Sequence, residues 1–394
     1  MLSHSEREIL DAIESEPLFR LTAEMVRRPS VSGDERGITE FMANVLADHG
    51  FAVAMPEAVP GRPNVVTSWG ADEGPALLLT GHSDTVPIGD GWTHDPVGAE
   101  IVDGRLYGRG SCDMKAGLAG MMTALIAAKR TFGMPRGRLV FAACIDEEEG
   151  GLGTQAAIRE GLQADWAVIG EPTDLQVIVS AKGNCYFEVD VRGRGAHAGS
   201  PERGINAIYG AAWAINTVEM HHADLQVRRH PLLGAPSASV GTIAGGLTVS
   251  AVPDHCRFAV DRRLLPDETG TGALAEFAAC LHRSIPRPNG VEISERLTME
   301  MPAMETPADH PLVAAMQAAA RDAGAPDFAA GGWSAACDGG FLRRDAAMPV
   351  VLFGPGSIVN QAHRPDEFVP LSETLTAARA YAVLAARVLA GVTQ

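Results

Sequence analysis

The stretch LLLTGHSDTVP at residues 77–87 is the most informative in the chain. An apolar run ends at Gly81, a His-x-Asp triplet follows, and Pro87 stops it. The apolar run predicts a buried strand, and ligands in an open α/β sheet bind just beyond the carboxyl ends of strands. His82 is therefore a candidate metal ligand, and Asp84 lies where it can hold the second ring nitrogen of that histidine. A structural core histidine is the alternative interpretation, so other ligands must come from elsewhere in the chain.

Length and charge limit the number of domains that this chain can form and the kinds of partner that it can bind. Its 394 residues exceed one ordinary core and predict two domains. Apolar residues make up 46% and charged residues 21%, as in globular proteins. The net charge is -17, from 32 Lys and Arg against 49 Asp and Glu. Such an acidic chain is a poor partner for polyanions, so we expect no nucleic acid and no membrane partner.

The cysteines and the N-terminus indicate the compartment. None of the six cysteines forms a Cys-x-x-Cys pair, and several, such as Cys144, lie in apolar runs. This is typical of small core residues in a reducing compartment. Residues 1–8 have no apolar signal core, and no apolar run approaches the roughly 18 residues of a membrane span. These features predict a cytoplasmic protein.

Residues 1–180 alternate predicted helices and strands, which indicates an α/β sheet with helices on both faces. The predicted strands are 51–55, 64–69, 76–81, 138–144 and 165–170, and the predicted helices are 5–28, 32–49, 114–130 and 152–161. Ser32-Gly33-Asp34-Glu35 has the spacing of a capping box and predicts the start of the second helix.

Residues 181–300 follow a different order, strand-helix-strand-strand-helix-strand, which is the ferredoxin-like pattern. The predicted strands are 184–192, 238–243, 256–264 and 291–296, and the predicted helices are 203–222 and 270–284. Residues 301–394 then provide helix 309–323, strand 348–353 and helix 372–391. We expect one domain made of 1–180 and 301–394, with 181–300 inserted into it; three independent domains are the alternative.

Four further segments place acidic residues or a histidine next to predicted strands or turns. Each has an ordinary explanation: Asp113 could be a helix N-cap, and the acidic run 146–149 could be a solvated loop. Together with His82 they supply the nitrogen and oxygen ligands that suit Zn²⁺, Co²⁺ or Mn²⁺. In the acidic run, one carboxylate can bind metal while its neighbour stays free as a base. The candidate residues are Asp113, Glu147, Glu148, Glu171 and His363.

The motifs that carry these candidate residues, and their order along the chain, resemble those of a known family. This is the acetylornithine deacetylase and succinyl-diaminopimelate desuccinylase family of dinuclear zinc hydrolases, which includes aminoacylase and glutamate carboxypeptidase. The matching motifs are Gly81-His82-x-Asp84-x-Val86-Pro87, Gly108-x-Gly110-Ser111-x-Asp113-Met114-Lys115, Asp146-Glu147-Glu148, Gly170-Glu171-Pro172 and the late His363. The resemblance implies an α/β fold: an aminopeptidase-like mixed sheet with helices on both faces, plus an inserted ferredoxin-like α+β dimerisation domain.

The resemblance also implies a metal centre. His82 and Glu171 would bind one ion, Glu148 and His363 would bind the other, and Asp113 would bridge them. The implied cofactor is two Zn²⁺, with Co²⁺ or Mn²⁺ as alternatives. The peptide bond after the bridging Asp113 would be cis.

Five further residues take roles from the resemblance. Asp84 would orient the first histidine ligand, and Glu147 would be the general base. His197 would reach the site of a partner subunit and donate to the oxyanion. Arg263 would hold the substrate carboxylate as a bidentate fork, although a surface ion pair with its neighbouring aspartate is the alternative. Gly356 would contribute to substrate binding.

The substrate is indicated by departures within the family pattern. Ser250 replaces an Asn that helps to engage substrate in the family, so the implied substrate geometry does not carry over at this position. Lys182-Gly183-Asn184 replaces the Arg-Arg-Gly of desuccinylases, and this second departure disfavours desuccinylation. Residues 354–367 are closest to acetylornithine deacetylases. The resemblance therefore implies a homodimer that hydrolyses a small N-acyl amino acid, most simply N-acetylornithine, in amino acid metabolism and arginine biosynthesis. The alternatives are a general aminoacylase, an N-formyl deformylase, a carboxypeptidase and a non-catalytic ligand-binding relative.

Overall fold

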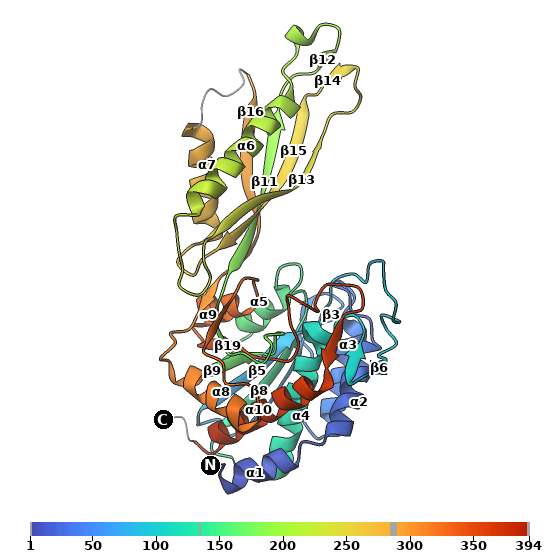
Figure 1. Ribbon diagram of the computed structural model, residues 1–394, viewed down its shortest axis with the longest axis vertical. Helices are drawn as coiled ribbons and strands as arrows, with labels where there is room; N and C mark the ends of the chain where they lie inside the picture. The colour runs from blue at the N-terminus through green and yellow to red at the C-terminus, as the bar shows by residue number, and fades with distance from the viewer. Residues whose placement is uncertain (1, 134, 284–289, 392–394) are drawn as a thin grey trace. The chain divides into compact units, whose positions relative to one another are not determined.

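A computed structural model describes residues 2–133, 135–283 and 290–391 (Figure 1). The chain divides into two compact units. The first comprises Met1–Val179, Glu305–Gly332 and Phe341–Gln394, and the second comprises Ser180–Met304 and Trp333–Gly340. In the described ranges, no helix is both long and apolar enough to cross a bilayer.

The larger sheet is mixed, with strand order β1-β4-β8-β5-β9-β19-β10-β17 and β18 paired with β10. Its central neighbours β8, β5, β9 and β19 are parallel, whereas β1, β4 and β10 pair antiparallel. All seven residues of β5 are buried, as expected of a strand covered on both faces. The strands are β1 (Val53–Ala54), β4 (Val65–Gly70), β5 (Ala76–His82), β8 (Arg138–Cys144), β9 (Trp166–Ile169), β10 (Ile178–Ala181), β17 (Met304–Glu305), β18 (Gly331–Trp333) and β19 (Val350–Leu352).

Two helices of the first unit, α4 (Ala116–Thr131) and α10 (Leu371–Leu389), pack on each other and on β5 and β8 (Figure 1). Gly120 lies at this contact, where a Cβ would come within 3.3 Å of the Tyr381 ring. The other helices of this unit are α1 (His4–Asp11), α2 (Ser15–Val26), α3 (Arg36–Asp48), α5 (Leu152–Arg159) and α8 (Pro311–Asp322). Helix α9 (Gly339–Ala346) begins at the boundary between the units, and the short strands are β2 (Glu57–Val59), β3 (Arg62–Pro63), β6 (Ile101–Val102), β7 (Arg105–Tyr107) and β20 (Phe368–Pro370).

Two local predictions for this unit are wrong. The single helix predicted over 5–28 is two helices, α1 and α2. The predicted capping box at 32–35 is also absent, since α3 begins at Arg36 without a side-chain cap. The Ser32 hydroxyl instead donates to Asp84 (2.7 Å), and the Glu35 carboxylate accepts from Arg62 (2.8 Å), so long-range partners have taken both capping groups.

The second unit has an antiparallel sheet of order β13-β15-β11-β16, made of β11 (Gly183–Arg192), β13 (Ser237–Gly245), β15 (His255–Leu264) and β16 (Glu292–Met301). With α6 (Ala207–Leu225) and α7 (Gly270–Arg283), this is the expected ferredoxin-like order. Alternate residues such as Phe187 and Phe258 are buried with residues of both helices, whereas Glu188 on the opposite face pairs with Arg296 (2.6 Å). The predicted end of α7 at 284 lies outside the described residues.

The predicted α/β fold class is thus confirmed, with a mixed sheet and a ferredoxin-like unit. Residues 333–340, from the last section of the sequence, belong by their contacts to the second unit. That unit also contains a short ribbon of β12 (Ala196–His197) and β14 (Ala251–Val252).

Candidate metal centre

The carboxyl ends of four parallel strands meet at one edge of the larger sheet. The register pairs the last residue of β5 with the last of β8, His82 with Cys144, and the last of β9 with the last of β19, Ile169 with Leu352. Thr80 of β5 pairs with Ile169. The segments that follow the four strands therefore start beside one another, where ligands bind in open α/β sheets. These segments carry Asp84, Glu147, Glu148, Glu171 and His363.

Two groups of three ligand atoms form at this edge. One consists of His82, Asp113 and Glu171, and the other of Asp113, Glu148 and His363; within each group the ligand atoms lie within 4.8 Å of one another. Asp113 belongs to both because its oxygens face different histidines. Oδ1 lies 3.0 Å from His82 Nε2, and Oδ2 lies 3.1 Å from His363 Nε2. Two histidines and three carboxylates, one of which is the shared aspartate, are a donor set that fits two divalent ions of the zinc type.

Asp113 is carried by η1 (Ser111–Lys115), a short π-helix immediately before α4. The Asp113–Met114 peptide bond is cis, as the family resemblance implies. An N-cap role for Asp113 is ruled out, since Lys115 occupies the position before α4 and makes no side-chain cap. The carboxylate is instead directed at the two histidines.

Asp84 supports the site in two ways. His82 Nδ1 lies 2.9 Å from the Asp84 backbone oxygen, whereas the nearer Asp84 carboxylate oxygen is 3.6 Å away. The carboxylate accepts hydrogen bonds from the backbone N–H groups of Glu147 and Glu148, both at 3.1 Å, and from the Ser32 hydroxyl. Asp84 thus holds the histidine through its carbonyl and the acidic turn through its carboxylate. This role of Ser32 is not predicted from the sequence, because the spacing of Ser32 and Glu35 is that of a capping box.

The electrostatics of the site favour a cation. Burial opposes protonation of His82, but its contacts with Asp113 and Asp84 raise its pKa well above the ordinary value. Hydrogen bonds that the His363 ring donates to the carboxylates of Asp113 and Glu148 raise the pKa of His363 to about 10. Burial is the largest cause that raises the pKa of Glu148. The carboxylates therefore favour the protonated form of the neighbouring histidines, His82 and His363. A divalent ion would take the place of those protons.

Glu147 lies beside the ligands but belongs to neither group. Its backbone is fixed by Asp84, its side chain is largely buried, and its charge acts on His82, whose pKa it helps to raise. A carboxylate in this position can exchange a proton with a reacting group without being a ligand itself.

Gly356 lies in the loop after β19, and its backbone N–H donates to Glu373 (2.8 Å). Its φ is 85°, and a Cβ would lie 2.6 Å from Cys112 Sγ, so both conformation and space require glycine.

Two predicted site residues belong to the second unit. His197 is exposed in β12, and its Nδ1 accepts the Gly199 N–H (3.0 Å), so the neutral ring carries its hydrogen on Nε2 as a donor. Arg263 in β15 makes a bidentate ion pair with Asp261 (2.9 and 2.8 Å), the alternative that the sequence leaves open.

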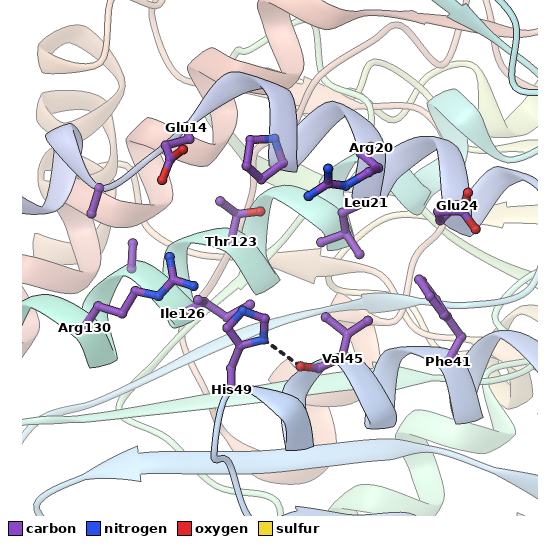
Figure 2. Close-up of a pocket in the computed structure, with 13 residues that line it drawn as sticks. Glu14, Arg20, Leu21, Glu24, Phe41, Val45, His49, Thr123, Ile126 and Arg130 are labelled. Atoms are coloured by element: carbon purple, nitrogen blue, oxygen red, sulfur yellow. Dashed lines mark hydrogen bonds between the residues drawn. The ribbon is translucent and has the colours of Figure 1, made fainter.

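A separate cavity of about 460 Å³ lies among α2, α3 and α4 (Figure 2). Its walls include Leu21, Phe41 and Val45, and charged groups of both signs, such as Arg20 and Glu24, lie around it. The predicted site residues are not among those that line it, so this cavity is distinct from the metal centre.

The chain is similar to known proteins over most of its length. Residues 78–387 match the sequence model of peptidase family M20/M25/M40. The acetylornithine deacetylase of Photorhabdus laumondii subsp. laumondii is 30% identical over 383 residues, which are 91% of this chain and 94% of that protein.

Two solved structures are similar in fold. One is aminopeptidase PepT from Bacillus cereus, with a TM-score of 0.77, 23% identity, and coverage of 96% of this chain and 99% of that one. The other is the Bacillus subtilis YXEP protein, a dinuclear metal binding peptidase from the M20 family, with a TM-score of 0.72, 16% identity, and coverage of 95% and 98%.

Proposed function

Since the chain belongs to peptidase family M20/M25/M40 and is a hydrolase, we propose that it cleaves the amide bond of a small N-acyl amino acid at a dinuclear metal centre. The observation that carries the proposal is the pair of ligand groups that share Asp113, with Glu147 beside them and in neither group. The family resemblance of the sequence motifs is confirmed by the family match over residues 78–387 and by the relative that is 30% identical to this chain.

The metal ligands are assigned as the sequence implies. We assign His82 and Glu171 to one ion, Glu148 and His363 to the other, and Asp113 to both, with Zn²⁺ as the first candidate and Co²⁺ or Mn²⁺ as alternatives. When bound, such a pair of ions supplies Lewis-acid polarisation of the amide carbonyl and lowers the pKa of the attacking water.

Side chains of the protein carry out proton transfer, positioning and stabilisation of the oxyanion. Glu147 takes a proton from the attacking water and passes it to the leaving amine. Asp84 keeps the turn that carries Glu147 in place through two backbone hydrogen bonds. His197, whose Nδ1 accepts the Gly199 N–H, donates from Nε2 to the developing oxyanion in the site of a second copy.

N-acetylornithine is the proposed substrate, supported by the relative that is 30% identical to this chain. A general aminoacylase, an N-formyl deformylase and a carboxypeptidase remain the alternatives within the same chemistry. The ion pair of Arg263 with Asp261 means that a substrate carboxylate would compete with that partner for the guanidinium. Gly356 contributes backbone rather than a side chain to the loop that carries His363.

We also propose a cytoplasmic homodimer without nucleic acid or membrane partners, in line with the net charge of -17. The dimer is supported by the second unit, where β13 is an edge strand and the following loop exposes Leu247 and Val249 completely. Sedimentation velocity tests it, and a monomer at micromolar concentration would refute this part of the proposal.

The chemistry is tested by Glu147→Gln. This variant should bind two metal ions per chain like the wild type, yet turnover should fall by about 10²–10⁴-fold because the proton carrier is gone. Metal content is measured by equilibrium dialysis, and turnover is measured on a panel of N-acyl amino acids that includes N-acetylornithine.

Glu149→Gln is the matched control, because this exposed neighbour lies outside both ligand groups and its substitution should leave turnover unchanged. Equal turnover of Glu147→Gln and wild type would refute the assignment of the base. A wild type that hydrolyses no member of the panel with Zn²⁺ or Co²⁺ would favour a ligand-binding protein.

A further inference from the structure

A buried ion pair beside the metal centre has no part in the chemistry described above. Arg109 Nη1 lies 2.5 Å from Glu367 Oε2, and the two residues are only 6% and 1% exposed. Removing two charges from water is costly, and such a pair is a poor source of stability compared with apolar residues of similar size. The burial of this ion pair is therefore better explained by the hydrogen bonds that Arg109 and Glu367 form with neighbouring backbone segments.

Glu367 holds the backbone that carries the shared ligand. Its Oε1 accepts the N–H groups of Cys112 (2.9 Å) and Asp113 (3.1 Å). Its backbone oxygen accepts the N–H of Gly108 (2.9 Å). The start of the segment and the aspartate that faces both histidines are thus fixed to one residue far away in the sequence.

Arg109 holds the segment that follows the first histidine ligand. Its Nη2 donates to the carbonyl oxygens of Pro87 (3.3 Å) and Ile88 (3.2 Å), a few residues after His82 and Asp84. The guanidinium also lies 5.2 Å from the centre of the Trp92 ring.

The third segment carries His363, four residues before Glu367. This histidine lies in a loop and has a left-handed φ of 60°, so no strand or helix fixes it directly. The end of the loop is attached by Glu367, by Asp366, which accepts the Thr93 N–H (2.7 Å), and by pairing of β20 with β7.

We propose that the Arg109–Glu367 ion pair is a positioning pair that joins three ligand-bearing segments and sets the placement of Asp113 relative to His363. It determines the affinity of the second ion, held by Asp113, Glu148 and His363. This inference rests on the metal centre of the proposed function. Neither side chain is assigned as a ligand, and each acts through residues that are.

The test compares Glu367→Gln with the wild type by equilibrium dialysis against Co²⁺ and by the visible spectrum of the bound ion. The amide keeps one acceptor oxygen but loses the charge that faces Arg109. We expect the first ion to bind as in the wild type and the affinity for the second to fall about 10–100-fold, the usual effect of losing a residue that orients a ligand. The spectrum of the second Co²⁺ should change, and kcat should fall more than KM changes.

Glu6→Gln is the matched control. Glu6 pairs with Arg387 (2.6 Å), joins α1 to α10 in the same unit and is also buried, and in the part of the chain that the structure describes it forms no ion pair with a candidate ligand. This variant should lose thermal stability and keep both metal affinities. The proposal is overturned if Glu367→Gln behaves in the same way, with lower stability but two ions bound at wild-type affinity.

Arg109→Lys provides a second measurement in case Glu367→Gln does not fold. Lysine keeps the charge next to Glu367 but lacks the fork that also reaches the Pro87 and Ile88 carbonyls, so an intermediate loss of second-ion affinity is expected. Unchanged affinity in this variant would also overturn the proposal. Metal binding is measured without substrate, so a wild type that binds two ions but hydrolyses nothing refutes the proposed function and leaves this inference standing.

Discussion

Asp84 uses different atoms of one residue to hold two ligand-bearing segments. Its carbonyl oxygen faces His82, while its carboxylate accepts the backbone N–H groups of Glu147 and Glu148. Burial favours the neutral acid, but His82, the Ser32 hydroxyl and the Glu147 N–H together lower the pKa of Asp84. The residue is therefore an anion whose carboxylate accepts three hydrogen bonds.

Asp84→Asn should reduce kcat about 10–100-fold, because one amide oxygen cannot accept both backbone N–H groups and the turn that carries Glu147 loses a constraint. Steady-state kinetics on the best substrate of the panel measures the change, and far-ultraviolet circular dichroism verifies the fold. Ser32→Ala is the graded control, since it removes only one donor to the same carboxylate. Its kcat should fall much less, and a loss as large as that of Asp84→Asn would show that general loosening, not the turn, is responsible.

The sequence predicts the residues of the site better than their contacts. A strand end, a helix start and an acidic run are local signals, and they identified the segments that carry His82, Asp113 and Glu148. That Asp84 holds the acidic turn could not be predicted, because the contact joins residues 63 positions apart in the chain. The same holds for Glu367, which lies 254 positions from Asp113.

At the scale of elements, the contact of α4 with the segment after β9 brings Asp113 and Glu171 together. A Cβ at Gly117 of α4 would lie 2.1 Å from the Gly170 carbonyl oxygen, which is backbone and cannot move aside alone. At Gly120, three residues further along the helix, a Cβ would meet the Tyr381 ring at 3.3 Å, a contact that small shifts can relieve.

Gly117→Ala should therefore lower the free energy of unfolding by about 1–3 kcal/mol, as overpacking does, and weaken metal binding by separating α4 from Gly170. Gly120→Ala is the control on the same helix, where the better helix propensity of alanine offsets a mild contact. Urea unfolding and Co²⁺ dialysis measure both effects. Similar values for the two variants would mean that this helix tolerates displacement.

Long elements could be predicted because their apolar periodicity is strong. Strand 138–144 is observed with those bounds, and the ferredoxin-like order was visible in the sequence. The strands of two or three residues, such as β7 and β20, could not be predicted, since so few residues show no alternation. The capping box was wrong because Ser32 and Glu35 met stronger long-range partners.

On the scale of the whole molecule, stability in acid depends on a charge cluster in the second unit. Arg262 is fully buried and lies 2.7 Å from Glu268, which also binds Arg228. Burial raises the pKa of Glu268, but Arg262, the Leu265 N–H and Arg228 together bring it below its ordinary value of 4.5. Because the folded pKa is below the unfolded one, this contribution to stability is complete above pH 4.5 and is lost as pH falls through the folded pKa.

Glu268→Gln should destabilise the second unit by about 3 kcal/mol at neutral pH, because Arg262 keeps its charge in a buried position, and should flatten the loss of stability below pH 4.5. Hydrogen exchange of peptides from β15 and α7 between pH 3 and pH 7 follows this unit specifically. Glu276→Gln removes a neighbouring, more exposed partner of Arg228 and should leave the slope nearly unchanged. If the stability of Glu268→Gln falls below pH 4.5 as steeply as that of the wild type, Glu268 is not the group responsible for the loss in acid.

If Asp113, with one oxygen toward each histidine, is shared by two ions as we propose, this has a thermodynamic consequence for metal loading. Two sites that share a carboxylate cannot fill independently. In the proposed two-ion centre, a first ion would fix the orientation of Asp113 for the second, while repulsion between the two ions would act in the opposite direction. Whatever the balance, each ion must change the affinity of the other by the same factor, because the coupling free energy is reciprocal. The population of half-loaded protein at low metal concentration is thus a direct measure of how firmly this one side chain is held.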